Sequence, residues 1–194
     1  MPRINLITIG DASTGKSSCL HRYIKNYHDP SILTTIGLDY FYKTITLENQ
    51  KYEVQIFDTC GQERFYSITR SYYQRSSCVL LFCDVSNTDS FLHLNYWYSE
   101  IEPYKRPIIL LANKTDKHDR VVTVEDLTNF CIDKGIICYE TSSITGTNIK
   151  EAFDQAILRG IDWNLQSSGH SINNIPEINI SVSAYEKYKD CCKF

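Results

Sequence analysis

The chain has 194 residues, of which 42% are hydrophobic, and it carries a formal net charge of -3. This length and composition fit one globular domain with a substantial core, followed by a tail. The slightly acidic balance excludes a protein that binds nucleic acid or anionic lipid through bulk positive charge, so we expect no nucleic-acid partner.

The first predicted elements are a buried strand over 4–9 and a helix over 15–24. Between them, "GDASTGKS" (10–17) fits the phosphate-loop pattern G-x-x-x-x-G-K-[ST] in the strand–loop–helix context that the motif requires. Its backbone N–H groups can surround a triphosphate, Lys16 can offer a charge to the β and γ phosphates, and the Ser17 hydroxyl can bind magnesium. The motif indicates a nucleoside triphosphate without identifying the base. The alternative is a glycine-rich turn that binds nothing.

Two runs of alternating polarity, 38–47 and 51–58, come next, and the short connection between them (48–50) predicts an antiparallel hairpin at one edge of the sheet. Beyond the hairpin, apolar runs alternate with amphipathic stretches, which is typical of an α/β domain with a mainly parallel sheet. Helix caps are predicted at "SNTDS", at Thr123 and at Gly135. The remaining strands are predicted at 78–85, 107–113 and 136–140, and the remaining helices at 88–102, 124–134 and 147–164.

The periodicity stops after Trp163, which divides the chain into a domain over 1–165 and a flexible, variable tail over 166–194. The start of the chain lacks the pattern of a secretory signal, and no apolar stretch approaches the ~20 residues of a membrane helix. The eight cysteines form no C-x-x-C pair, and Cys78 and Cys83 lie in an apolar run, as small core residues do. We therefore expect reduced thiols and a protein that acts from the cytosol.

The tetrapeptide "NKTD" (113–116) follows the fifth predicted strand, at the edge where open α/β sheets bind ligands. A carboxylate at Asp116 can accept hydrogen bonds from N1–H and the exocyclic amine of guanine, whereas adenine has an unprotonated N1. By itself the tetrapeptide is also compatible with a solvated turn. However, the phosphate loop, Thr35, "DTCGQE" (58–63), "NKTD" and "ETSS" (140–143) occur in the order and spacing of one guanine-nucleotide site.

This set of motifs resembles the Ras superfamily of small GTPases over nearly the whole predicted domain, and within it the Rab family. The Rab resemblance is carried by "TTIGLDY" (34–40), "YKTITL" (42–47), "DTCGQERFYSITRSYYQR" (58–75) and "CDVSNTDSF" (83–91). It implies a small G domain of the P-loop NTPase class, with a six-stranded, mainly parallel sheet, one antiparallel edge strand and helices on both faces. It also implies a GTPase that cycles between GTP and GDP, uses Mg²⁺ and recruits effectors to membranes in vesicle trafficking.

The resemblance assigns a role to each motif residue. Thr35 would place its hydroxyl on magnesium and its N–H on the γ-phosphate, which the Gly61 N–H would reach from the other side. Loss of that phosphate would relax the segments 27–40 and 59–75. Gln62 would orient the attacking water, with Lys16 and Thr35 completing the catalytic set. Magnesium would be held by Ser17 and Thr35, with Asp58 just outside its direct ligands. The residues that would contact the nucleotide are Ala12, Ser13, Thr14, Gly15, Lys16, Ser17, Ser18, His28, Thr35, Gly61, Asn113, Lys114, Asp116, Thr141, Ser142 and Ser143.

The partners are also implied by the resemblance. No arginine is placed by motif to stabilise the transition state, so intrinsic hydrolysis should be slow and a GTPase-activating protein should supply that charge. Effectors would contact Ile36, Tyr40, Phe57 and Tyr72, although the three aromatic residues can equally pack the edge of the sheet. The other implied partners are an exchange factor and a GDP-dissociation inhibitor or escort protein.

Several positions depart from the Rab pattern. Ser13 stands where glycine is common and Cys60 where alanine is common, and these changes leave the rate of hydrolysis open. We interpret Cys60 as a small residue facing the core rather than a redox sensor. The ring that covers the guanine falls on His28, with Tyr27 beside it, and either can stack. In "ETSS", Ser143 replaces the usual alanine, and its N–H can still meet the guanine oxygen.

Two other functions compete with a GTP-hydrolysing switch. One is a GTP-binding recruitment module with little or no hydrolysis, which Ala12 and Ser13 make conceivable and Gln62 argues against. The other is a P-loop kinase, which would need an arginine-bearing lid that no segment matches and would leave "NKTD" without a role.

The chain ends in "KDCCKF" (189–194), which resembles the C-C-x-x terminus on which Rabs carry two geranylgeranyl groups. A single-prenyl signal starting at Cys191 fits less well, because Lys193 occupies a normally aliphatic position. The tail holds as many acidic residues as lysines, so no basic patch replaces a second lipid, and we expect both Cys191 and Cys192 to be modified. The protein is therefore expected on the cytoplasmic face of an intracellular membrane, with a cytosolic pool.

Overall fold

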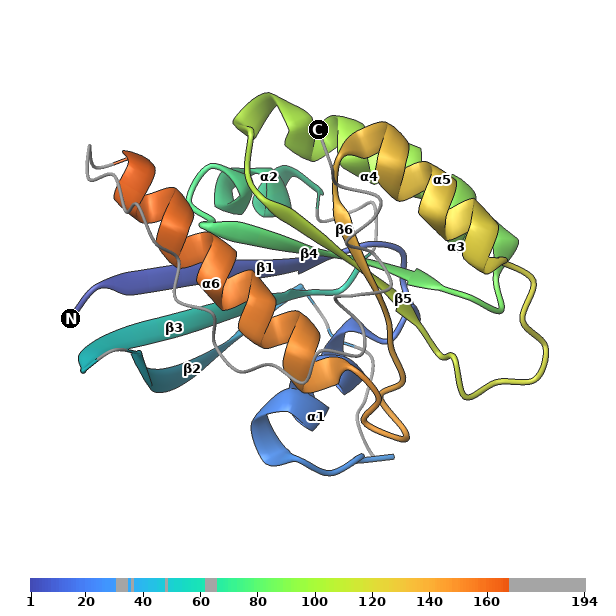
Figure 1. Ribbon diagram of the computed structural model, residues 1–194, viewed down its shortest axis with the longest axis horizontal. Helices are drawn as coiled ribbons and strands as arrows, with labels where there is room; N and C mark the ends of the chain where they lie inside the picture. Colours follow the sequence, from blue (N-terminus) through green and yellow to red (C-terminus); the bar gives the residue numbers. More distant parts are fainter. Residues whose placement is uncertain (31–34, 36, 48, 62–65, 168–194) are drawn as a thin grey trace.

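The structure is a computed structural model that describes residues 1–30, 35, 37–47, 49–61 and 66–167 (Figure 1). A six-stranded sheet forms its centre, with the strand order β2-β3-β1-β4-β5-β6. All neighbouring strands are parallel except β2 and β3, which confirms the predicted mainly parallel sheet with one antiparallel edge strand. The strands are β1 (Arg3–Ile9), β2 (Leu38–Leu47), β3 (Gln50–Thr59), β4 (Cys78–Asp84), β5 (Ile108–Asn113) and β6 (Ile137–Glu140).

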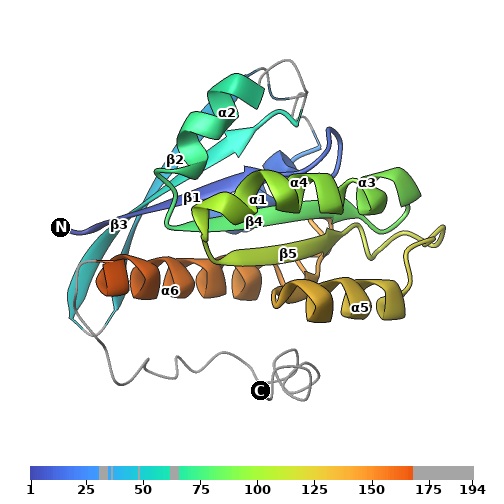
Figure 2. The ribbon, with the colours of Figure 1, turned by 90° about the horizontal axis from the view of Figure 1, so that it is seen from above.

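Helices cover both faces of the sheet, because the central strands are apolar on both sides and would otherwise expose a hydrophobic surface. One face packs against α1 (Lys16–Lys25) and α6 (Ile149–Ser167), which runs lengthwise beside the sheet in Figure 2. The other face packs against the remaining helices, which include α3 and α4 in place of one predicted helix. These are α2 (Tyr66–Tyr73), α3 (Thr88–Leu92), α4 (Leu94–Ile101), the short 3₁₀ helix η2 (Glu102–Tyr104) and α5 (Val124–Lys134).

The predicted caps and core cysteines are confirmed. The Asn87 side chain accepts a hydrogen bond from Ser90 N–H at the start of α3, and Thr123 forms a capping box with Asp126 at the start of α5. Gly135 ends α5 in the left-handed conformation, as a glycine after a helix commonly does. Cys78 and Cys83 are fully buried in the core.

The predicted helix over 88–102 is assigned as two helices, α3 and α4, which meet at His93. The backbone of His93 stays in the right-handed helical region (φ -70, ψ -10) and keeps its hydrogen bonds to the Asp89 carbonyl and from the Trp97 N–H, and a 3₁₀ turn extends the segment to Tyr104. The hairpin connection is also tighter than predicted, since Gln50 already pairs with Leu47 and Asn49 adopts φ 65. Helix α2 was not predicted at all.

Helix α6 continues past its predicted end at 164 and is helical through Ser167, where the described chain ends. Two side-chain hydrogen bonds support this last turn: Gln166 Nε2 donates to Asp162 Oδ2 (2.8 Å), and Ser167 Oγ donates to the Trp163 carbonyl (2.8 Å). The predicted tail over 166–194 otherwise lies outside the described residues. No helix of the described chain has the length and apolar character needed to cross a membrane.

Candidate functional site

The phosphate loop joins β1 to α1 and holds Lys16 beneath it. The Lys16 Nζ donates to the carbonyls of Gly10 (2.9 Å) and Asp11 (2.6 Å), and burial lowers the pKa of this amine to about 8. Gly15 needs to be glycine, since it has φ 93 and a Cβ there would lie 2.2 Å from Asn113 Nδ2. The loop therefore presents a buried cation together with the N-terminus of α1, which is a favourable combination for a polyphosphate.

Three oxygen-bearing side chains meet beside the lysine. Ser17 Oγ donates to Asp58 Oδ2 (2.5 Å) and lies 2.6 Å from Thr35 Oγ1, and Thr35 Oγ1 donates to the same Asp58 oxygen (3.2 Å). Burial raises the pKa of Asp58, while hydrogen bonds from Ser17 and Thr8 oppose this effect. Hydroxyl and carboxylate oxygens suit Mg²⁺, which prefers hard oxygen ligands, so these residues fit a magnesium ion at the phosphates.

The end of β5 supplies the residues expected to recognise the base. Asn113 Nδ2 donates to the Thr14 carbonyl (2.9 Å), and Thr141 Oγ1 donates to Asn113 Oδ1 (3.3 Å). Ser142 Oγ donates to Asp116 Oδ1 (2.5 Å), which fixes the orientation of that carboxylate. The "NKTD" and "ETSS" segments are thus bonded to each other and to the phosphate loop, as one site requires.

Asp84 supports the base-binding region, and the sequence reasoning missed it. Asp84 is the last residue of β4, and its Oδ2 lies 2.6 Å from Lys114 Nζ. The carboxylate also accepts hydrogen bonds from Ser86. Burial acts to raise the pKa of Asp84, but the hydrogen bonds from Lys114 and Ser86 outweigh it and lower the pKa. A charged residue that ends the apolar strand "CVLLFCD" was the available signal.

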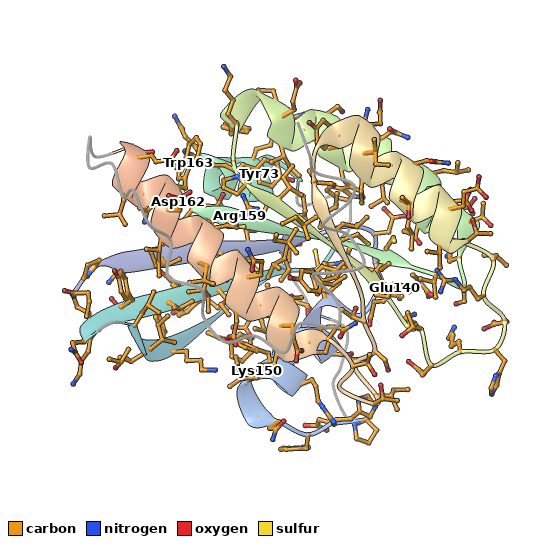
Figure 3. The ribbon with its side chains drawn as sticks, viewed as in Figure 1. Tyr73, Glu140, Lys150, Arg159, Asp162 and Trp163 are labelled. Carbon is orange, nitrogen blue, oxygen red and sulfur yellow. The ribbon has the colours of Figure 1, made fainter. Side chains whose placement is uncertain are left out.

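Glu140, the last residue of β6, connects the loop after β5 with the loop after β6 (Figure 3). Its carboxylate pairs with Arg120 (2.5 Å), and its carbonyl accepts from Asn148 Nδ2 (2.7 Å). Because the carboxyl ends of parallel strands meet at one edge of the sheet, these contacts rigidify the loops from β5 and β6 together.

A cavity of about 330 Å³ connects the phosphate and base regions. His28 lines it, whereas Tyr27 is absent from its lining and is 52% exposed, which favours His28 as the ring over the base. Cys60 is buried as expected, but it lines the cavity and belongs to neither hydrophobic core cluster of the described residues, so it faces the site rather than the core. Gln62 and Ile36 lie outside the described residues. The predicted nucleotide contacts that line the cavity are Ser13, Gly15, Lys16, Ser17, Ser18, His28, Thr35, Lys114, Asp116 and Ser143.

Not every predicted contact lines the cavity. Four of them are joined to the site by the hydrogen bonds given above: Thr14, Asn113, Thr141 and Ser142. Ala12 belongs to the phosphate loop, which borders the cavity. Gly61 packs onto the phosphate loop: with φ 70, a Cβ at this position would lie 2.5 Å from both Gly10 O and Lys16 Nζ. A side chain at position 61 would therefore displace the lysine.

Ser13 adopts φ 63, a left-handed conformation that costs a non-glycine residue about 1–2 kcal/mol. This backbone explains why glycine suits the position. We expect Ser13→Gly to raise the unfolding temperature by a few degrees, roughly as 1 kcal/mol does in a domain of this size. Thermal unfolding of both proteins measures this, with Ser18→Gly in the helix as a control that should instead destabilise. An unchanged or lowered unfolding temperature for Ser13→Gly would contradict the strain.

The three predicted effector aromatics lie together on the β2–β3 hairpin and α2. Tyr40 pairs with Phe57 across the two strands, and the Phe57 and Tyr72 rings are 4.7 Å apart. Phe57 is buried, whereas Tyr40 is 55% exposed. Packing thus accounts for Phe57, and an effector role for the three residues stays a prediction.

Comparison with known proteins adds family information to this geometry. The sequence profile described as "Ras family" matches residues 5–161. Ras-related protein Rab-9A of Rattus norvegicus is 37% identical over 162 residues, which cover 79% of this chain and 81% of the relative. Rab-9B of Homo sapiens is 35% identical with the same coverage, and Rab-32D of Dictyostelium discoideum is 32% identical over 185 residues, or 90% of this chain and 81% of that protein.

Proposed function

The chain belongs to the Rab family of small GTPases in the Ras superfamily, and on this premise we propose that it is a membrane-bound switch that recruits effectors in its GTP state during vesicle trafficking. The observation that carries the proposal is the convergence of Lys16, Ser17, Thr35 and Asp58 at one end of a cavity that has Asp116 at the other. A triphosphate and a guanine base need these two kinds of group at the two ends.

The residues divide the work according to their chemistry. Lys16 contributes a positive charge to the β and γ phosphates, and Ser17 and Thr35 would hold the Mg²⁺ ion, which neutralises charge on the phosphates when bound. Gln62 orients the attacking water in this proposal. Thr35 and Gly61 both respond to the γ-phosphate, so its loss releases two segments together and ends effector binding.

Single-turnover hydrolysis of GTP tests the switch. We expect the purified protein alone to hydrolyse GTP on the order of 10⁻⁴ to 10⁻³ per second, in the range of intrinsic Ras activity, and a Rab-directed activating protein to accelerate it. An activating protein is required because no motif of the chain supplies an arginine to the transition state. No acceleration by any such protein would contradict the switch and favour a recruitment module that hardly hydrolyses GTP.

The proposed effector surface consists of Ile36, Tyr40, Phe57 and Tyr72, beside the segments that respond to the γ-phosphate. An aromatic cluster next to such segments offers a state-selective partner an apolar contact. The further proposed partners are an exchange factor and a GDP-dissociation inhibitor or escort protein, which would maintain a cytosolic pool of the prenylated chain.

We expect Cys191→Ser alone to leave most of the protein in the cytosol. A single lipid chain gives only marginal membrane binding, and the tail has no excess of lysine that could add electrostatic attraction. Fractionation of cells that express the full chain measures the effect, with Cys131→Ser as the control because Cys131 lies in α5, far in sequence from the anchor. Full retention of Cys191→Ser on membranes would contradict the double anchor.

A further inference from the structure

The carboxylate of Asp11, in the phosphate loop, is held by two side chains of the segment that follows β4. His93 Nδ1 lies 2.7 Å from Asp11 Oδ2, and Trp97 Nε1 donates to Asp11 Oδ1 at 2.7 Å. We call these three residues the Asp11 clamp. Neither His93 nor Trp97 belongs to a nucleotide-binding motif, so the clamp joins the loop to α4 from outside the motif set.

The main chain of Asp11 faces the opposite way, toward the phosphate-binding lysine. Its carbonyl accepts from Lys16 Nζ at 2.6 Å and from Thr14 Oγ1 at 2.9 Å. The same residue therefore anchors the loop to α4 through its side chain and orients Lys16 through its backbone. A rotation of the Asp11 peptide would break the carbonyl contact, and the fixed carboxylate opposes that rotation.

The local structure is built around this contact. Trp97 is only 3% exposed, and a buried indole N–H needs an acceptor, which Asp11 provides. His93 precedes Trp97 by one helical turn, and its ring reaches the same carboxylate. Hydrogen bonds to an ionised group are about twice as strong as neutral ones, so two of them on one carboxylate fix its position well.

We propose that Asp11 is a positioning residue for Lys16, and that its clamp by His93 and Trp97 slows nucleotide release by keeping the phosphate loop in its binding conformation. This inference rests on the proposed binding of a guanine nucleotide at Lys16. It assigns to α4, which reaches the phosphate loop through Trp97 and Asp11, an influence on the residence time of the nucleotide.

The dissociation rate of a fluorescent GDP analogue, chased with excess GDP, tests the clamp. Trp97→Phe keeps an aromatic ring, although a smaller one, and removes the N–H donor, and we expect roughly tenfold faster release, as the loss of one hydrogen bond to a charged group supports. Tyr98→Phe is the matched control on the same helix and should leave release unchanged. Unchanged release in Trp97→Phe would overturn the proposal, whereas failure of the wild type to bind the analogue would overturn the proposed function instead.

The indole N–H signals in a ¹⁵N spectrum give a readout that folding alone does not change. The chain has two tryptophans. The second, Trp163, lies on α6, which packs on the opposite face of the sheet from α4, and its ring stacks against the Arg106 guanidinium. In Asp11→Asn we expect a shift of the Trp97 signal and an unchanged Trp163 signal. A Trp97 signal that is identical in the wild type and Asp11→Asn would overturn the clamp even if Trp97→Phe proved unstable.

A pH profile tests the contribution of His93. Its hydrogen bond with Asp11 raises the pKa of His93, and Asp89 on α3 acts in the same direction. The imidazolium–carboxylate pair is therefore complete below the ordinary histidine pKa of about 6.5 and is lost as the pH rises through the higher folded value. We use the ratio of release rates between His93→Asn and wild type, because titration of the nucleotide phosphates cancels in it. This ratio should be severalfold at pH 6 and should decline toward pH 8.5 as the ion pair of the wild type is lost. A ratio independent of pH would remove His93 from the clamp.

Discussion

Replacing Asp116 with asparagine is expected to lower the affinity for GDP by roughly a hundredfold or more, because two hydrogen bonds from guanine to a carboxylate are lost. The asparagine keeps the shape of the side chain but turns an amide N–H₂ toward the N1–H and amine of the base. In the wild type, Ser142 holds one carboxylate oxygen, so the side chain cannot swing away to avoid the mismatch. Competition with a fluorescent GDP analogue measures the loss.

Asp119→Asn is the matched control for this experiment. Asp119 is exposed in the same connection between β5 and α5, and the substitution makes the same change of charge. It should bind GDP as the wild type does. If ATP competed with GTP for the wild-type protein at similar affinity, the guanine specificity assigned to Asp116 would be refuted.

Lys16→Met is expected to weaken the binding of GTP by roughly a thousandfold, since two charge-assisted hydrogen bonds to phosphate are lost while the apolar stem of the side chain is kept. Lys16 is nearly fully buried, so no water can take over the role of the ammonium group at low cost. Lys25→Met, at the exposed end of the same helix, is the control and should bind normally. Measuring the affinity of Lys16→Met and Lys25→Met for GTP at pH 7.5 tests this prediction.

The pH dependence of the same equilibrium gives an independent check on Lys16. Burial lowers the pKa of Lys16 to about 8, and the negative charge of phosphates favours its protonated form. Above pH 8 the free protein must take up a proton in order to bind, so the affinity of the wild type should fall by up to tenfold per pH unit. Loss of the guanine N1–H at high pH weakens both proteins, so Lys16→Met should show a smaller fall than the wild type. A ratio of the two affinities that stays constant between pH 8 and 9.5 would contradict the lowered pKa of Lys16.

The contiguous motifs were predictable because each one forms its part of the site from neighbouring residues. The phosphate loop needs glycines, a lysine and a hydroxyl at fixed spacing between a strand and a helix, and "GDASTGKS" provides them. The strands were predictable for a similar reason, since apolar runs bounded by polar residues indicate buried strands. The contacts of His93 and Trp97 were not predictable, because their partner Asp11 lies 82 and 86 residues earlier in the chain.

The choice of His28 over Tyr27 also depended on the structure. Both rings are neighbours in sequence, and only the path of the chain after α1 places His28 on the cavity and leaves Tyr27 exposed. The backbone of Ser13 also depended on the structure, since the sequence marks this residue as unusual but does not reveal its φ of 63. Local patterns carry residue types and spacing, whereas backbone angles at such positions follow from the packing around them.

The sequence by itself determined the fold class, the order of the strands along the chain, the phosphate loop and the choice of guanine, because these depend on periodicity and on short motifs whose chemistry is local. The tertiary structure decided which residues support those motifs from a distance. Asp84 reaches Lys114, and His93 and Trp97 reach Asp11, across separations of 30 residues or more. Such contacts form only when the parallel strands bring their carboxyl ends to one edge of the sheet, so no pattern within a short window of sequence contains them.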